Sequence, residues 1–432
     1  MTILKAVRGT RDLLPPETAL WNRIEATARD VFARYNFGEI RTPVFEETVL
    51  FARGVGEETD IVSKEMYTWE DRARAQSEKT QSLTLRPENT AGVVRAAIEH
   101  NLFESGQLQK LYYIGPQFRR ERPQKGRYRQ FSQIGAEVIG PPSSGSESPL
   151  RDAEILEMLA TLLDELGITG WTLELNSVGS AADRERYNQT LRAALVPVVS
   201  QMCADCQRRA QTNPLRVLDC KVPEDQPIIA TLPKITDSLD QKSKDHFAAV
   251  TAALDAAGVP YRLNPRLVRG LDYYTRTTFE FTHGGLGAQN ALLGGGRYDG
   301  LSEAIGGPKA PGIGFAMGLD RLVLTLEATE ADQKAGADAA AKVDAYIAPL
   351  GEKLNAAALI LARELRRAGL SIELGDGSFR LKKSFEAADK VARRIVIVGE
   401  DELQSGILTV KDFATGTQSK VPRAELVSFL AE

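Results

Sequence analysis

The sequence predicts a mixed α and β protein of more than one domain, and three observations support this. Two strand-like segments around a long polar loop, 111–119 and 131–139, predict an antiparallel hairpin. A helical stretch without glycine-rich punctuation follows at about 180–257, and from about 343 strands alternate with helices. At 432 residues, the chain also exceeds what one hydrophobic core usually serves.

Composition and charge are those of an ordinary globular protein, with 43% hydrophobic residues, 26% charged residues and a net charge of -4. No apolar run reaches the roughly 18 residues of a membrane helix. The first residues lack the apolar stretch and cleavage pattern of a signal peptide. We therefore expect a cytoplasmic protein without a membrane partner. The negative net charge argues only weakly against a nucleic-acid partner, because whole-chain charge hides local basic patches.

The three cysteines, Cys203, Cys206 and Cys220, suit a reducing compartment better than a disulfide framework. The first two form a C-x-x-C pair, which also occurs in zinc sites. A zinc site needs a fourth ligand, however, and no Cys or His follows Cys220 at a zinc-finger-like spacing. The favoured interpretation is reduced, partly buried thiols with no metal, and metal binding is the alternative. The three histidines of the chain are expected to have ordinary structural positions.

The predicted hairpin has one polar and one apolar face. The period of two along a strand sets Gln133 and Glu137 on the same face of the second strand. Arg119, at the end of the first strand, joins this face and completes a charged floor for a small polar ligand. The connecting loop has an excess of basic residues against one acid, Glu121. Such an excess suits a polyphosphate, an RNA end or both, and a solvated hairpin tip is the alternative.

Two segments combine the end of a strand with the start of a helix. Residues 85–91 leave Glu88 and Thr90 at a helix start, where a plain N-cap is the alternative role for Thr90. Residues 312–322 consist of a strand, a glycine and a helix. Arg321 lies in the first turn of that helix, where the helix dipole favours anions. We therefore expect Arg321 to meet a negatively charged ligand.

Two further segments have the composition of a binding site. Residues 269–276 are expected to form a strand, with Tyr273 and Tyr274 on opposite faces. The glycine-rich segment 294–301 predicts a turn at which a ligand can approach the backbone. The chain has neither the P-loop spacing nor a Rossmann glycine fingerprint between a strand and a helix.

Together these segments resemble the class II aminoacyl-tRNA synthetases. Residues 111–140 look like motif 2, residues 312–322 like motif 3, and residues 39–46 like motif 1, the element of the dimer interface. Within the class, residues 269–274 and 294–301 are similar to two histidine-specific motifs of the histidyl-tRNA synthetases. Two more segments match the opening and the insertion of the bacterial-type members, residues 8–12 and 213–221.

The resemblance implies a domain organisation. An α+β catalytic domain with an antiparallel sheet of the class II synthetase type spans 1–328, and a helical module is inserted in it at about 180–257. A linker at 329–342 leads to a C-terminal α/β anticodon-binding domain at 343–432. Basic residues on a predicted helix of that domain suit RNA or, as the commoner alternative, a solvated face. Motif 1 implies a homodimer.

The implied activity is that of a histidine–tRNA ligase. Such an enzyme uses ATP, accompanied by Mg²⁺, to convert L-histidine to histidyl-adenylate, and then transfers the histidyl group to the 3′ end of tRNA(His). A catalytically inactive, histidine-binding regulatory paralogue is the alternative. Such proteins typically lack the C-terminal domain and lose the ATP-binding arginines, and this sequence keeps both.

Matching the motifs position by position assigns roles to individual residues. The catalytic arginines are Arg119 and Arg269. The residues assigned to ATP are Arg119, Glu121, Arg127, Phe131 and Arg321. The residues assigned to histidine are Glu88, Thr90, Gln133, Glu137, Arg269, Tyr273, Tyr274 and Tyr298. The residues assigned to the acceptor end of the tRNA are Arg122 and Gln124.

These assignments suit the chemistry that the resemblance implies. Attack of a carboxylate on the α-phosphate gathers negative charge on oxygen atoms, and fixed guanidinium groups stabilise that charge. Neutral imidazole offers one N–H donor and one lone-pair acceptor, which Glu137 and Tyr274 can both satisfy. A competing amino acid without those atoms leaves buried polar groups unpaired and is therefore rejected.

Overall fold

The computed structural model describes residues 3–57, 59–71, 80–124, 126–286, 290–328 and 342–431. The chain divides into two compact units, residues 1–336 and 337–432, and each unit is described by itself. The linker expected at 329–342 lies outside the described residues except for Lys342. Within the described ranges, no helix is both long and apolar enough to cross a membrane.

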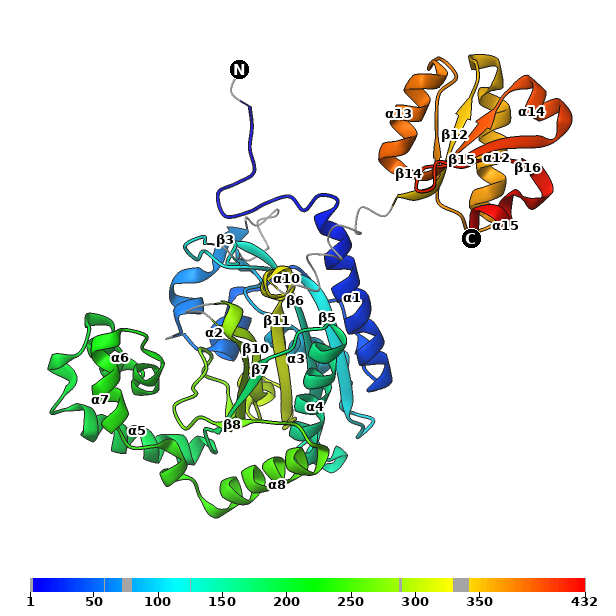
Figure 1. Cartoon of the computed structure of the whole chain (residues 1–432). Helices are drawn as coiled ribbons and strands as arrows, with labels where there is room; N and C mark the ends of the chain where they lie inside the picture. The colour runs from blue at the N-terminus through cyan, green and yellow to red at the C-terminus, as the bar shows by residue number, and fades with distance from the viewer. Residues whose placement is uncertain are drawn as a thin grey trace. The chain divides into compact units, whose positions relative to one another are not determined.

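The first unit is built on an eight-stranded sheet with the strand order β1-β5-β6-β11-β10-β9-β7-β8 (Figure 1). Neighbouring strands are antiparallel, except that β1 pairs with β5 and β8 with β7 in parallel. The antiparallel sheet predicted for this part of the chain is confirmed. The strands are β1 (Gly38–Glu39), β5 (Gln109–Phe118), β6 (Gln130–Ile139), β7 (Trp171–Ser177), β8 (Arg262–Leu263), β9 (Thr275–His283), β10 (Ala291–Arg297) and β11 (Gly312–Gly318).

Strands β5 and β6 form the predicted hairpin, in which Leu111 lies opposite Glu137. Ile134, Ala136 and Val138 of β6 belong to the main hydrophobic core. The apolar face of β6 is therefore the structural face, as the alternation along the strand predicts.

Helices that are far apart in the sequence cover the core face of this sheet. Apolar residues of α1, α4, α8 and α10 join those of the strands in the main core. In α1, buried residues recur at the three- and four-residue spacing of a helix face, Trp21, Ile24, Ala28, Val31 and Phe32. These helices are α1 (Glu17–Arg34), α4 (Pro149–Glu165), α8 (Gln241–Ala257) and α10 (Leu319–Glu327).

A small antiparallel sheet with the order β2-β4-β3 precedes the hairpin in the sequence. Strand β4 ends at Leu85 and α3 begins at Thr90, so the strand end and helix start predicted for 85–91 are confirmed. The elements of this region, with the later α9, are β2 (Phe45–Glu47), α2 (Thr48–Val55), the π-helix η1 (Ile61–Glu65), β3 (Tyr67–Asp71), β4 (Gln81–Leu85), α3 (Thr90–Glu99) and α9 (Leu301–Ala304).

Residues 181–257 consist of helices and short 3-10 helices joined by brief loops. Most of this stretch surrounds a separate apolar core that includes Tyr187, Val217 and Ile229. Helix α8 differs, because its Val250 and Leu254 belong to the main core. By its packing, the module with its own core therefore ends before α8. Its elements are α5 (Ala181–Leu195), η3 (Val199–Gln201), α6 (Ala204–Thr212), η4 (Pro214–Asp219), η5 (Pro223–Asp225), α7 (Gln226–Thr231) and η6 (Ile235–Ser238).

The second unit is a small α/β domain with a five-stranded sheet of order β13-β12-β14-β15-β16. The first three strands are parallel, and β15 and β16 are antiparallel additions. The predicted alternation of strand and helix is confirmed. The elements are β12 (Val343–Pro349), α12 (Asn355–Arg367), β13 (Ile372–Leu374), α13 (Leu381–Val391), β14 (Ala392–Val398), α14 (Glu400–Ser405), β15 (Ile407–Asp412), β16 (Gln418–Pro422) and α15 (Leu426–Ala431).

A buried ionic network centred on Asp152 of α4 connects several elements of the first unit. Its carboxylate pairs with Arg297 of β10, accepts from Thr277 of β9 at 2.6 Å and contacts His246 of α8 at 2.8 Å. Burial would raise the pKa of Asp152, but Arg297 and His246 hold that pKa below its ordinary value. Asp152 is therefore an anion with several partners, and His246 is one of them.

We expect His246→Ala to lower the free energy of unfolding by about 1–3 kcal/mol, because one oxygen of a buried carboxylate loses a hydrogen bond. Urea unfolding followed by circular dichroism measures this change. The matched control is His100→Ala, since His100 is exposed. Equal stability of the two variants would contradict a structural role for His246.

Candidate active site

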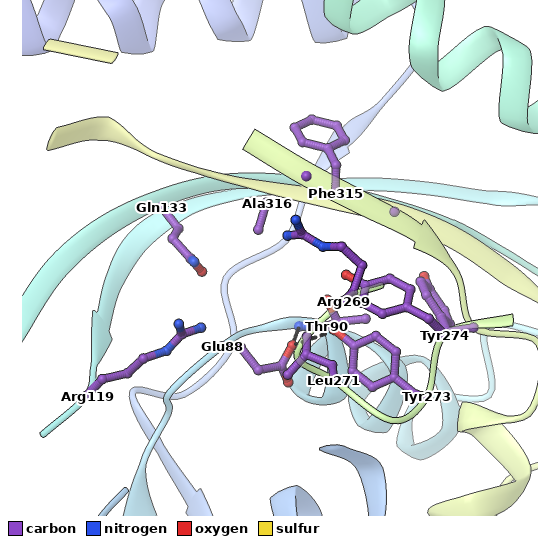
Figure 2. A pocket seen from close by; sticks show the side chains of 13 residues that line it. Glu88, Thr90, Arg119, Gln133, Arg269, Leu271, Tyr273, Tyr274, Phe315 and Ala316 are labelled. Carbon is purple, nitrogen blue, oxygen red and sulfur yellow. Dashed lines mark hydrogen bonds between the residues drawn. The ribbon is translucent and has the colours of Figure 1, made fainter. Parts of the chain in front are cut away.

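The first of two adjoining pockets is lined by β6, β10, β11 and the start of α3. Figure 2 shows Glu88 and Thr90 near Tyr273 and Tyr274, with Arg269 above them. The residues assigned to histidine that line this pocket are Glu88, Thr90, Gln133, Arg269, Tyr273, Tyr274 and Tyr298. Glu137 is the one assigned residue that is absent from the lining.

The second pocket is lined by residues of the hairpin, of strands β9, β10 and β11 and of α10, several of them charged. All of the residues assigned to ATP line it, namely Arg119, Glu121, Arg127, Phe131 and Arg321. The two pockets share five lining residues, Arg119, Gln133, Arg269, Gly294 and Ala316. Arg119 and Arg269 therefore border both pockets. Where a ligand in the first pocket meets a ligand in the second, two guanidinium groups are close by.

Arg119 is held in place by contacts on two sides. Its Nε donates to the carbonyl oxygen of Pro87 at 2.9 Å, and its guanidinium lies 5.4 Å from the ring centroid of Phe131. Its nearest carboxylate is that of Glu121 at 3.8 Å, while Arg127 lies 3.3 Å from the same side chain. The end of the guanidinium is therefore positioned beforehand and still available for an anion.

Arg269 reaches the shared border from a loop and pairs with Glu280 of β9. Space for it comes from Gly294 of β10, which pairs with Glu280 in the sheet register. A Cβ at Gly294 would lie 2.6 Å from the guanidinium of Arg269. This glycine is needed for the close approach of a side chain, and not for a turn. The turn predicted for 294–301 is wrong at its start, because β10 continues to Arg297.

Glu88, and not Thr90, caps helix α3. The carboxylate of Glu88 accepts from the backbone N–H groups of Thr90 and Ala91, both at 2.9 Å. Burial raises the pKa of Glu88, and these two amides oppose the rise. The hydroxyl of Thr90 donates instead to Glu137 at 2.7 Å, so the N-cap alternative for Thr90 is wrong.

Glu137 lies directly behind the wall of the first pocket. Its side chain is fully buried and accepts from Thr90 and from the hydroxyl of Tyr298, each at 2.7 Å. Burial raises its pKa to about 8. Gly314 of β11 lines the pocket, and a Cβ at that position would overlap the Glu137 carboxylate. The carboxylate of Glu137 can therefore lie next to the pocket only because Gly314 has no side chain.

The strand predicted for 269–276 is wrong for 269–274, because β9 begins at Thr275 and the preceding residues form a loop. Contacts from outside the sheet fix this loop: the backbone N–H of Asp272 donates to the carbonyl oxygen of Val55 at 3.1 Å, and Asn213 donates to its carboxylate at 2.9 Å. Tyr273 and Tyr274 consequently line one pocket, with ring centroids 4.8 Å apart, and do not occupy opposite faces.

Two exposed residues of the β5–β6 loop lie outside both pockets, although Gly126 and Arg127 of the same loop line the second one. Arg122 and Gln124 are exposed and line neither of them. Backbone hydrogen bonds in both directions between Gln124 and Arg127, at 3.1 and 2.9 Å, close the turn. Lys125, part of the basic excess noted in the sequence, is outside the described residues. An exposed tip with an ordered base is suited to a large partner.

Arg321 is the third residue of α10, as predicted for the first turn of that helix. Burial, and then the positive charge of Arg127, lower the pKa of Arg321. Arginine nevertheless stays protonated at neutral pH. Its Nη1 donates to the carbonyl oxygen of Ala291 at 2.5 Å. A half-buried cation at a helix N-terminus makes this end of the second pocket electropositive, which suits a phosphate group.

Sequence reasoning missed two supporting pairs. Glu280 lies between two phenylalanines of β9, and an acid between two aromatic residues of a strand was a usable signal. Arg11 donates to Asp320 of α10 at 2.9 Å and lies 4.7 Å from the ring centroid of Tyr128. The pairing of Arg11 with Asp320 joins residues far apart in the sequence, so no local pattern indicates it.

Comparisons with known proteins agree with this geometry. The family model described as histidyl-tRNA synthetase matches residues 9–322. The chain belongs to the histidyl-tRNA synthetase family. A second family model, described as an anticodon binding domain, matches residues 344–432. Both parts of the expected architecture of a histidyl-tRNA synthetase are thus present in the chain.

Individual relatives match the chain over nearly its whole length. The histidine–tRNA ligase of Koribacter versatilis (strain Ellin345) is 72% identical over 429 residues, which are 99% of this chain and 96% of the relative. That of Solibacter usitatus (strain Ellin6076) is 55% identical and covers 99% of both chains. The apo histidyl-tRNA synthetase of S. aureus is 36% identical, with a TM-score of 0.80 and full coverage of both chains. The class II synthetase fold is therefore confirmed.

Proposed function

We propose that this chain activates L-histidine with ATP and then transfers the histidyl group to tRNA(His). In the first step, a carboxylate oxygen of histidine attacks the α-phosphorus of ATP, the bond to the β-phosphate oxygen breaks, and pyrophosphate leaves. In the second step, a ribose hydroxyl at the 3′ end of the tRNA attacks the carbonyl carbon of histidyl-adenylate, and AMP leaves. Membership of the histidyl-tRNA synthetase family supports this chemistry.

One observation carries the proposal: Arg119 and Arg269 border both pockets. The α-phosphate of a bound ATP would lie where the pockets join, since the histidine carboxylate must reach it there. Two fixed guanidinium groups at that point attract the carboxylate and stabilise the charge that builds up on the phosphate oxygens. Because the carbonyl oxygen of Pro87 already orients Arg119 and the carboxylate of Glu280 orients Arg269, little reorganisation is needed during the reaction.

The second pocket has partners for each part of ATP. Glu121 is proposed to accept from the adenine amino group, and Phe131 to stack on the base. Arg321 would cover the other face of the base and contact phosphate. Arg127 would bind the γ-phosphate. Its side chain is 40% exposed and has room to move toward a ligand.

The first pocket supports selection of histidine. Glu88, Thr90 and Gln133 are proposed to hold the α-amino group, in a site where burial favours hydrogen-bonded partners. The imidazole would lie between Tyr274 and the carboxylate of Glu137. Tyr298 lines the pocket and also donates to Glu137, so it orients this carboxylate.

We also propose that Mg²⁺ enters with ATP. Mg²⁺ is usually bound by phosphate oxygens, water and one or two carboxylates. Glu280 supplies a carboxylate in the lining of the nucleotide pocket, beside Arg269, and therefore fits such an ion. When bound, the ion neutralises charge on the β- and γ-phosphates.

We propose one RNA contact in each of the two units. Arg122 and Gln124, exposed at the tip of the hairpin loop, would meet the acceptor end of tRNA(His). Residues 343–432 would bind the anticodon, consistent with the domain model matched there. Within that domain, Arg394 is structural, since it pairs with Asp412 at 3.0 Å and donates to two carbonyl oxygens of α15. This role in protein synthesis also supports a cytoplasmic location.

ATP–pyrophosphate exchange tests the activation step. With each of the twenty amino acids in turn, we expect exchange with histidine only, because other side chains lack the N–H donor and the acceptor that imidazole offers to Tyr274 and Glu137. Charging of tRNA(His) with labelled histidine tests the transfer step. Histidine binding by calorimetry without any exchange would contradict the proposal and favour a regulatory paralogue. The full complement of arginines and the C-terminal domain disfavour that alternative.

We propose that the chain forms a homodimer and that the small three-stranded sheet is part of the dimer interface. Exposed apolar side chains gather on its strands and the adjoining helix, Val44 at 39%, Phe45 at 53%, Val49 at 44% and Trp69 at 39% exposed. The rings of Phe45 and Trp69 lie 6.0 Å apart and form one apolar surface. Such surfaces commonly mark protein interfaces. This one overlaps the segment that resembles motif 1.

We expect Phe45→Glu to raise the dimer dissociation constant at least about tenfold, because a charge is buried in an apolar interface. Sedimentation velocity over a range of protein concentrations measures the change. Leu359→Glu in the second unit is the matched control, since Leu359 is also 53% exposed. A wild-type monomer, or equal dissociation constants for both variants, would sink the dimer proposal.

A further inference from the structure

The three cysteines and Asp225 meet inside the helical module, outside both active-site pockets. Cys203 precedes α6, Cys206 lies in its first turn, Cys220 follows η4 and Asp225 ends η5. The three sulfur atoms and a carboxylate oxygen all lie within 4.8 Å of one another. Three separate elements of the chain, α6, η4 and η5, thus converge on one small volume.

The cluster is buried and carries negative charge. Cys206, Cys220 and Asp225 are at most 6% exposed. The Asp225 carboxylate accepts from the backbone N–H of Cys203 at 3.0 Å and lies 3.2 Å from the sulfur of Cys220. Across the described ranges of the chain, it forms no ion pair with a Lys, Arg or His side chain. Its hydrogen-bond donors in the cluster, a backbone amide and a thiol, carry no charge, so nothing there balances the charge of this buried carboxylate.

We propose that Cys203, Cys206, Cys220 and Asp225 bind a structural Zn²⁺ ion. Sulfur ligands about 2.3 Å from a tetrahedral zinc ion lie about 3.8 Å apart. The sulfur atoms of Cys203 and Cys220 lie 3.9 Å apart. Four protein ligands leave no open position, which is typical of a structural site and not of a catalytic one. The favoured interpretation of the sequence, thiols without a metal, missed the fourth ligand because Asp225 does not have the spacing of a zinc finger.

The ion would hold a segment that contacts the active-site loop. Residues 213–219 lie between Cys206 and Cys220, and their Asn213 donates to Asp272 at 2.9 Å. Arg216 of the same segment lies 3.5 Å from the carboxylate of Asp60. Loss of zinc is therefore expected to raise the KM for histidine, an effect that rests on the proposed function. Binding of zinc itself does not depend on that function.

The metal content of the full-length protein, produced without a histidine tag, tests the site. Mass spectrometry of elements is expected to find about one zinc per chain after extensive dialysis. We expect Cys203→Ser and Asp225→Asn to reduce this content at least about fivefold, because each removes one of four ligands. Asp205→Asn is the matched control, since Asp205 lies between Cys203 and Cys206 but is exposed and pairs with Arg208. It should retain the wild-type content.

A second measurement on the wild-type chain covers the case in which the variants fold poorly. Cobalt exchanged into the site should give thiolate-to-metal charge transfer and the strong visible absorption of tetrahedral Co²⁺. A thiol reagent should release zinc in proportion to the cysteines that it modifies. The proposal is overturned by a zinc-free protein with three titratable thiols, by a Cys203–Cys220 disulfide, or by unchanged zinc in both ligand variants.

Discussion

Replacing Arg269 with alanine is expected to lower histidine-dependent ATP–pyrophosphate exchange at least about 10³-fold, the range seen when a phosphate-binding arginine is lost in phosphoryl transfer. Arg269 borders both pockets, so its guanidinium can contact the substrate carboxylate and the α-phosphate together. The loss should appear mainly in kcat, because the charge it stabilises is greatest in the transition state.

Arg269→Lys should recover only part of the activity, since an ammonium group keeps the charge and loses the planar fork of donors. The matched control is Arg34→Ala, which removes a surface arginine paired with Glu165 and should leave exchange unchanged. Because Arg269→Ala leaves Glu280 without its partner, thermal unfolding of each variant must accompany the assay. Exchange within threefold of wild type in a folded Arg269→Ala protein would refute the catalytic assignment.

The parts of the fold that local patterns determine could be predicted from the sequence. Alternation along β6 correctly separated the apolar face of Ile134 and Ala136 from the polar face of Gln133. The glycine between β11 and α10 marked the position of Arg321 in a first helical turn. In these cases, neighbouring residues carry all of the information, because the period of a strand or helix fixes which side chains share a face.

Tertiary contacts determine the parts that could not be predicted. The loop at 269–274 looks like a strand in sequence, but Val55 and Asn213 hold Asp272 away from strand pairing. Asp225 joins the three cysteines only because η5 folds back on α6. Residues from distant segments decide both outcomes, and no period in the sequence records them.

A second large effect is expected from Glu137→Gln, which should lower kcat/KM for histidine about 5- to 150-fold, because leaving one buried hydrogen-bonding group unsatisfied costs about 1–3 kcal/mol. The KM for ATP should change little, since Glu137 does not line the nucleotide pocket. Gly314→Ala should have a similar effect, because its Cβ would overlap the Glu137 carboxylate. The control is Gly38→Ala, a strand glycine with nothing within 4 Å of an added Cβ.

Glu137→Gln should also change how the stability of the chain depends on pH. The substitution removes the ionisable group and keeps nearly the same side-chain shape. Burial raises the pKa of Glu137 to about 8 in the folded chain, above the roughly 4.3 of an exposed glutamate. Between these two values the unfolded chain has lost a proton that the folded chain keeps, so the wild type loses stability as pH rises. The glutamine side chain of the variant does not titrate. The melting temperature of Glu137→Gln should therefore exceed that of the wild type at pH 8.5, and the difference should shrink toward pH 5. A difference that is the same at both pH values would mean that Glu137 is not held neutral by burial, and its place behind Gly314 would then need another explanation.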